Sequence, residues 1–180
     1  MEHPAETLTR DAVRLRRWHD DEVDLVHRVV TGSLPHLRPW LRWAELPYNR
    51  DAAAVFLAKS RERWRSGMAY AYAITEDDVV AGACALMRPL TADSLQLGYW
   101  LHPAHTGRGL ATVAASLLVD EAFLLPGIRR VEIWHDAANI ASEAVPRRLG
   151  FVEVGRHSTR GEPLTSGKIG IDVVWERKAS

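Results

Sequence analysis

The sequence is poor in the features that mark disulfide-bonded, nucleic-acid-binding and membrane proteins. Its one cysteine, Cys84, excludes an internal disulfide. Lys and Arg together number 23, as do Asp and Glu, so the formal net charge is zero. That balance argues against a nucleic acid or an anionic membrane as partner. The longest apolar run, residues 110–119, is interrupted by Thr112 and Ser116 and is too short to cross a bilayer. The first twenty residues lack the apolar stretch of a signal peptide, so we expect a cytoplasmic protein.

The composition is that of an ordinary globular protein, with 47% hydrophobic and 26% charged residues. No repeat, low-complexity tract or linker divides the 180 residues. A chain of this length buries roughly 70% of its unfolded surface without help from a metal or a disulfide. We therefore expect one domain spanning residues 1–180.

Hydrophobic spacing predicts helices that separate short strands, which is typical of an α/β or α+β protein. The first helix follows the acidic residues 20–22 and is expected to end at Gly32 and Pro35, and residues 34–47 read as an irregular connection. The expected strands are 13–17, 69–75, 79–86, 95–101, 131–135, 151–156 and 169–177, and the later helices are 51–65, a helix from the glycine loop to about 124, and 139–149.

The strongest functional signal is the loop that follows the strand at 95–101. Gly107 and Gly109 allow a tight turn, and the helix after them begins without a capping side chain. Free N–H groups at a helix start suit a phosphate or pyrophosphate, and Arg108 adds a cation. A glycine turn without a ligand is the plain alternative. The sequence contains no GxxxxGK[ST], and its GxG lacks the third glycine of a dinucleotide-binding loop.

Three segments in register resemble the GNAT N-acetyltransferase superfamily. Residues 106–111, TGRGLA, are similar to its acyl-CoA pattern Q/R-x-x-G-x-G/A, and the N-x-x-S of 139–142 and the RLGF of 148–151 follow in order. Residues 97–101 and 36–43 further resemble the branch of the ribosomal-protein-serine and -alanine N-acetyltransferases. The resemblance implies a GNAT-like mixed sheet of six to seven mostly antiparallel strands, with about four helices and a central strand–loop–helix acyl-CoA site.

The resemblance also implies acetyl-CoA as the acyl donor. Its pantetheine arm would pair with the strand backbone, its pyrophosphate would bind the loop N–H groups, and a backbone N–H near the strand end would polarise the thioester carbonyl. The implied binding residues are Tyr99, Trp100, Leu101, Thr106, Gly107, Arg108, Gly109, Leu110, Ala111, Asn139 and Ser142.

Two departures from the family pattern concern the phosphates and the acid. Thr106 stands where the family has Gln or Arg, so one phosphate contact is expected to be missing. Pro146 stands where many members place the Tyr that protonates the leaving thiolate, which makes Ser142 the best candidate for that role. Pro146 has no N–H, so it also frees the carbonyl of Ser142 within a helix, and a simple kink of that helix is the favoured meaning of the proline.

The general base is also replaced. Gln96 occupies the position of a Glu found in many relatives, and Glu132 on the next strand is the substitute, with His135 and Asp136 as further candidates. A carboxylate on an edge or solvent face of the sheet is the plain alternative for Glu132. An α-amine with a pKa of about 7.7–8.0 is roughly 10–20% neutral at pH 7, whereas a lysine is under roughly 0.1% neutral. A site without an obvious base therefore favours an α-amine acceptor.

Aromatic side chains between the first two helices form the candidate acceptor site. The resemblance implies that His36, Trp40 and Trp43 bind substrate, while packing of the helices is the alternative for the two tryptophans. His102 and His105 have the spacing of metal ligands, but no third ligand is evident nearby, so no metal is expected. Cys84 lies in an apolar strand and reads as a buried hydrophobe.

The sequence thus predicts an enzyme that transfers an acetyl group from acetyl-CoA to a primary amine in a ternary complex. The favoured acceptor is a protein N-terminal amine of the ribosomal-protein kind. A small-molecule amine is the alternative acceptor, and a non-catalytic CoA-binding module is the alternative class. No nucleic-acid or membrane partner is expected, and the resemblance leaves room for a homodimer.

Overall fold

The computed structural model describes residues 3–89, 93–159, 161 and 163–179. These residues form one eight-stranded sheet in the order β1-β2-β3-β4-β5-β6-β8-β7, in which β5 and β6 are parallel and every other neighbouring pair is antiparallel. The strands are β1 Thr7–Arg10, β2 Val13–Arg17, β3 Ala69–Glu76, β4 Val79–Met87, β5 Ser94–Leu101, β6 Arg130–Asp136, β7 Val152–Ser158 and β8 Ile171–Lys178. The helices are α1 Val23–Leu37, α2 Arg50–Ser66, α3 Leu110–Leu124 and α4 Ile140–Arg148, with short 3₁₀ turns η1 Arg42–Glu45 and η2 Pro103–His105.

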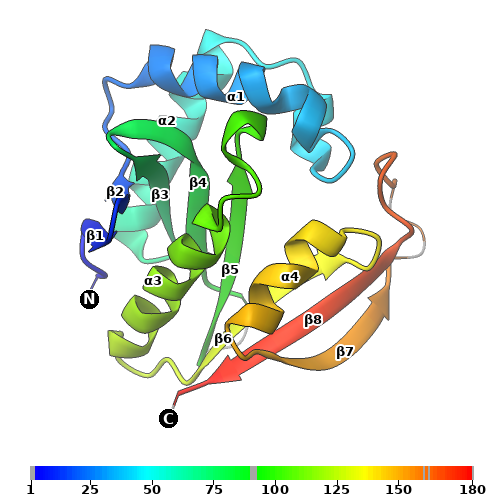
Figure 1. Cartoon of the computed structure of the whole chain (residues 1–180). Helices are drawn as coiled ribbons and strands as arrows, with labels where there is room; N and C mark the ends of the chain where they lie inside the picture. The colour runs from blue at the N-terminus through cyan, green and yellow to red at the C-terminus, as the bar shows by residue number, and fades with distance from the viewer. Residues whose placement is uncertain (1–2, 90–92, 160, 162, 180) are drawn as a thin grey trace.

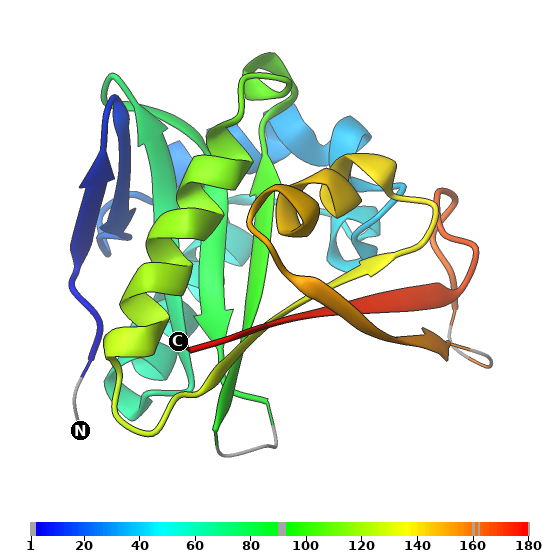
Figure 2. The same ribbon diagram turned by 60° about the horizontal axis from the view of Figure 1, so that its bottom comes forward.

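The helices cover both faces of the sheet. α1 and α2 pack on one face, and α3 and α4 pack on the other (Figures 1 and 2). Val26 and Leu57 belong to the core under α1 and α2, whereas Leu118 and Val145 belong to the core under α3 and α4. The predicted mixed, mostly antiparallel sheet with four helices is confirmed. The strand missed in the sequence is β1, an edge strand of sequence TLTR in which Leu8 is the apolar residue that packs on the core.

The expected end of the first helix was wrong. α1 continues through Gly32 and Pro35 to Leu37, and η1 interrupts the connection that was expected to be irregular. Gly32 is needed for close packing, because a Cβ there would lie 2.9 Å from the His102 Nε2 atom. Pro35 lies in the last turn, where it removes the N–H that would otherwise bond the Thr31 carbonyl, and the helix ends two residues later.

The two halves of the sheet separate between β5 and β6. Their parallel pairing covers four residue pairs, from Ser94 with Arg130 to Leu97 with Ile133. Beyond Leu97, β5 continues beside β4 while β6 continues beside β8, and Figure 1 shows the two strands diverging between α3 and α4. This divergence opens the cleft described below.

A glycine fixes the backbone where β5 leaves the sheet. A Cβ on Gly82 would lie 2.2 Å from the Trp100 carbonyl oxygen and 2.9 Å from the Leu101 Cα. Gly82 also adjoins a bulge, since the register between β3 and β4 shifts beside Ile74. Bulges increase local twist, so this part of β4 shapes the open end of β5.

The segment before β8 is tied to both sides of the opening. The Thr165 hydroxyl and the Gly167 N–H donate to the Pro39 carbonyl, at 2.5 and 2.9 Å. At its other end, the Asp136 carboxylate accepts from the N–H groups of Ile169 and Gly170. Among the described residues, no helix is both long and apolar enough to span a bilayer.

Candidate functional site

A cleft of about 930 Å³ lies where β5 and β6 diverge. It reaches from the start of α3 to the segment that joins α1 and α2, so both halves of the sheet contribute to its walls. Its lining includes predicted residues from four segments, namely His36, Trp40, Tyr99, Trp100, Leu101, Thr106, Gly107, Gly109, Leu110, Ala111, Asn139 and Ser142. The structure therefore brings together most of the residues implicated by sequence.

One end of the cleft is a loop rich in free N–H groups. Gly107 and Gly109 have φ values of 74° and 80°, the left-handed region that glycine adopts without strain. From Gly107 to Ala111, no backbone N–H has a hydrogen-bond partner among the described residues. These five groups lie at the positive end of α3, which starts without a side-chain cap. The arrangement fits a pyrophosphate.

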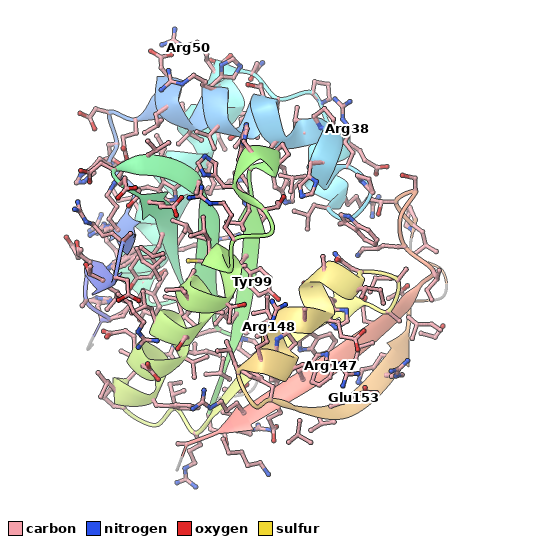
Figure 3. All side chains as sticks on the ribbon, viewed as in Figure 1. Arg38, Arg50, Tyr99, Arg147, Arg148 and Glu153 are labelled. Carbon is pink, nitrogen blue, oxygen red and sulfur yellow. The ribbon has the colours of Figure 1, made fainter. Side chains whose placement is uncertain are left out.

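The cations near this loop differ from those predicted. Arg108 lies outside the cleft lining and binds Glu76 of β3, with Nη1–Oε2 and Nη2–Oε1 distances of 2.7 and 2.8 Å. Arg148, at the end of α4, lines the cleft and has no hydrogen bond or ion pair with any other described residue. Figure 3 shows Arg148 beside Tyr99 in the opening, whereas its neighbour Arg147 lies towards β8. Sequence reasoning missed Arg148, because its side of α4 depends on how that helix packs.

β5 offers backbone groups to the cleft. The His102 N–H donates to the Ala81 carbonyl on β4 at 2.8 Å, which fixes the alternation of hydrogen bonds along the strand. The N–H and C=O groups of Trp100 therefore face β4, whereas those of Tyr99 and Leu101 face the cleft. Tyr99 and Leu101 can thus pair with an extended arm, and Trp100 contributes its side chain to the lining.

Ser142 is held from two sides in the first turn of α4. Its N–H donates to the Asn139 Oδ1 at 3.1 Å, so Asn139 is the N-cap of the helix. Its carbonyl oxygen accepts from the Tyr99 hydroxyl at 2.9 Å, and its Oγ lies 3.2 Å from the same hydroxyl. Burial raises the pKa of Tyr99 to about 12, and the contact with Ser142 opposes that shift. Tyr99 is therefore a neutral hydrogen-bond donor at physiological pH.

The carboxylate and imidazole candidates for the base have other partners. The buried His135 accepts at Nε2 from the Trp175 indole N–H, at 2.9 Å, so its Nδ1 carries the proton that reaches the Asp136 carbonyl. Burial alone would raise the pKa of Asp136, but N–H donation from Ala138, Ile169 and Gly170 outweighs it and lowers that pKa. Both groups are thus structural.

Glu132, the substitute base, is not brought into the cleft. It lies outside the lining residues and accepts from the Trp134 indole N–H at 2.9 Å. Gln96 does line the cleft, so a neutral amide stands at the position on β5 where the resemblance expects a Glu base.

The other end of the cleft carries aromatic and charged groups. His36 and Trp40 line it as predicted, whereas Trp43 lies outside the lining, 39% exposed, with its ring centroid 6.3 Å from that of Trp100. Trp134 and Asp172 also line this end, and sequence reasoning missed both. The Asp172 carboxylate is half-buried and has no side-chain partner among the described residues. A carboxylate in a cleft that indole rings also line suits a cationic amine.

The remaining candidates have no role at the cleft. His102 accepts from the Ala104 N–H, and burial lowers its pKa. In the described parts of the chain, no group of three or more His, Cys, Asp or Glu could hold a metal ion. Cys84 is buried, and burial raises its pKa, so the thiol is unreactive.

Comparison with known proteins agrees with this geometry. The profile of the family described as "Acetyltransferase (GNAT) domain" matches residues 12–152. YdaF of Bacillus subtilis (strain 168), named for ribosomal N-acetyltransferase activity, is 26% identical over 149 residues, which are 80% of each chain. The ribosomal-protein-serine acetyltransferase of Escherichia coli (strain K12) is 22% identical over 81% of this chain and 82% of its own.

Solved structures share the fold at low identity. RimL, a ribosomal alpha-N-protein acetyltransferase in complex with coenzyme A, superposes with a TM-score of 0.88 at 22% identity, covering 96% of this chain and 98% of its own. MccE, the microcin C7 self-immunity acetyltransferase in complex with acetyl-CoA and AMP, gives 0.85 at 19% identity over 94% of both chains. The family profile matches most of the chain, so this protein belongs to the GNAT acetyltransferase family, whose acyl donor is acetyl-CoA.

Proposed function

We propose that this protein acetylates the N-terminal α-amine of a protein, with a ribosomal protein as the favoured acceptor. The observation that carries the proposal is the chemistry of the two ends of one cleft. One end presents five free N–H groups and Arg148, which suit the phosphates of acetyl-CoA. The other presents Asp172 with Trp40 and Trp134, which suit a cationic amine.

Direct transfer needs little chemistry from side chains. Acetyl-CoA supplies an activated acetyl thioester; the reaction forms a C–N bond, breaks the C–S bond and moves one proton from nitrogen to sulfur. The Leu101 N–H faces the cleft and polarises the acetyl carbonyl. The Ser142 hydroxyl donates a hydrogen bond to the leaving sulfur. Alignment of the two reactants supplies most of the rate.

The acceptor is inferred from the scarcity of free bases. His135 and Asp136 are fully engaged, and Glu132 lies outside the lining. The described lining leaves His36 and Asp172 as groups that can take a proton. An α-amine is already roughly 10–20% neutral at pH 7, so it needs less help from a base than a lysine does.

A small-molecule amine is the second candidate acceptor. RimL acts on a ribosomal α-amine, whereas MccE, of nearly equal structural similarity, is an immunity enzyme for microcin C7. Both proteins share the fold of this chain, so the choice between the two classes of acceptor depends on the residues at the acceptor end of the cleft.

The first test is a thermal-shift titration with acetyl-CoA, CoA and ATP. A ligand at a hundred times its Kd adds about 2.7 kcal/mol, which raises the Tm of a domain of this size by roughly 5–11 °C. We expect this shift with both CoA species and not with ATP. No shift at millimolar acetyl-CoA would remove the enzyme proposal.

The second test is an amine panel read by thiol release. It compares peptides with a free N-terminal Ser or Ala, the same peptides blocked at the N-terminus but carrying a lysine, and amino sugars. The proposal predicts turnover with the free peptides. Turnover with amino sugars alone would establish the second candidate, and tight CoA binding without any turnover would indicate a binding module.

A further inference from the structure

α4 contains a gap in its hydrogen bonds at the point where it borders the cleft. Pro146 lies in the helix and has no N–H, so the carbonyl of Ser142, four residues earlier, receives no helical hydrogen bond from it. This partly buried carbonyl is therefore open to another donor. That donor is the Tyr99 hydroxyl of β5, 2.9 Å from the Ser142 oxygen.

The same phenol also holds the Ser142 hydroxyl. A carbonyl oxygen can only accept, so the Tyr99 phenol is the donor in the 2.9 Å bond. The Ser142 Oγ lies 3.2 Å from the same phenol oxygen and can accept a share of that proton in a three-centre hydrogen bond. Tyr99 then holds the Ser142 oxygen from the β5 side and leaves the serine's own proton for a ligand in the cleft.

We propose that Tyr99 is a positioning residue, which uses the carbonyl left free by Pro146 to present the Ser142 hydroxyl to the cleft as a hydrogen-bond donor. The contact joins β5 to α4 across the opening, beyond the last parallel residue pair at Leu97 and Ile133. Tyr99 thus also sets the distance between the strand that offers backbone groups to the acyl arm and the helix that carries Ser142. The inference rests on the proposed function, because Ser142 matters only where a sulfur must be stabilised.

The kinetic test is a double-mutant cycle. Ser142→Ala should lower kcat by about 10²-fold. Tyr99→Phe keeps the ring and should lower kcat by about ten-fold, the effect of one lost hydrogen bond, with the Kd of CoA within two-fold of wild type. The double variant should be no slower than Ser142→Ala alone. A further ten-fold loss in the double variant, or an unchanged kcat in either single variant, would overturn the proposal.

The matched control is Tyr72→Phe. Tyr72 is buried in β3, and its hydroxyl also donates to a backbone carbonyl, that of Ala5 at 2.8 Å, but it lies outside the cleft lining. Both Phe variants should lower the Tm by about 2–6 °C. Only Tyr99→Phe should lower kcat; an equal loss of kcat in both variants would show a merely structural effect.

A stability test separates this inference from the proposed function, because it needs no turnover. Pro146→Ala supplies an N–H to the Ser142 carbonyl, so it should raise the Tm more in the Tyr99→Phe protein than in wild type. It should leave the kcat of Tyr99→Phe low, since it does not redirect the Ser142 hydroxyl. Equal Tm gains in both backgrounds, or a restored kcat, would refute the positioning role. Absence of turnover by wild type with every amine would instead refute the proposed function.

Discussion

Arg108 and Glu76 form a paired contact that fastens the glycine loop to β3, with two N–O distances of 2.7 and 2.8 Å. The guanidinium that the sequence offered to the phosphates is therefore occupied in positioning the loop. Among the described residues, Arg148 and Lys168 are the lysine and arginine side chains that line the cleft, and Arg148 approaches from α4 on the opposite wall. Arg108 thus positions the loop, and Arg148 is the arginine that faces the cleft.

Arg148→Ala should weaken binding of acetyl-CoA. The loss of one free cation near the phosphates is expected to raise the Kd about five- to ten-fold, measured by calorimetric titration at low salt. Arg147→Ala is the control: it removes the same charge from the same helix, but Arg147 pairs with Glu143 and stacks on Trp175. Equal effects of the two variants would mean that only net charge matters.

Gly109→Ala should also weaken acetyl-CoA binding, for a conformational reason. At a φ of 80°, an alanine costs about 1–2 kcal/mol and turns the free N–H groups out of line. Gly127 has a φ of 78° beyond the other end of α3, and an alanine methyl group there would have no atom within 4 Å. Gly127→Ala should therefore lower the Tm as much as Gly109→Ala does and leave the Kd of acetyl-CoA unchanged. An equal loss of affinity in both variants would contradict binding of the phosphates by the free N–H groups of residues 107–111.

Asp172→Asn should raise the KM for the amine by about ten-fold with little change in the KM for acetyl-CoA, because a partly desolvated charge pair is lost. The KM of wild type should rise with added salt, and that of the variant should not. Asp120→Asn, on the exposed side of α3 and paired with Arg10, is the control. An unchanged amine KM in Asp172→Asn would place the acceptor elsewhere.

Asp136→Asn should show a pH-dependent loss of stability. Donation from three backbone N–H groups lowers the pKa of Asp136, so the ionised carboxylate stabilises the folded state above the ordinary pKa. The loss should be about 1–3 kcal/mol at pH 7 and should shrink as the pH falls below about 4, measured by urea unfolding from pH 3 to 7. A difference that stays constant across this range would contradict the role of the charge.

Local pattern predicted the parts of the site that lie close together in the chain. The tight glycine turn at Gly107 and Gly109 is confirmed by their left-handed backbone, and Pro146 lies inside α4 as expected. Each of these features depends on a few adjacent residues. The contact of Asn139 with a pantetheine arm stays a prediction, and the structure adds that Asn139 is the N-cap of α4.

Contacts between distant segments could not be predicted in this way. The partner of the Ser142 carbonyl is 43 residues away, and that of Arg108 is 32 residues away, so both depend on sheet register and helix packing. Glu132 was chosen by its position on the strand after the loop, yet its face of β6 directs it to Trp134. Gly32 was read as a helix end because its packing against His102 is invisible in the sequence.

The way residues 163–170 are attached bears on how the amine specificity of this enzyme can change. Thr165 and Gly167 bind the Pro39 carbonyl, Asp136 accepts from the Gly170 N–H, and the Gly170 carbonyl accepts from the Thr159 N–H. None of these bonds involves the glycine loop, β5 or Ser142. Exchange of residues 163–170 should therefore alter the choice of amine and leave the binding of acetyl-CoA intact. Gly167 must be retained in such an exchange, because a Cβ there would lie 2.7 Å from the Pro39 carbonyl oxygen.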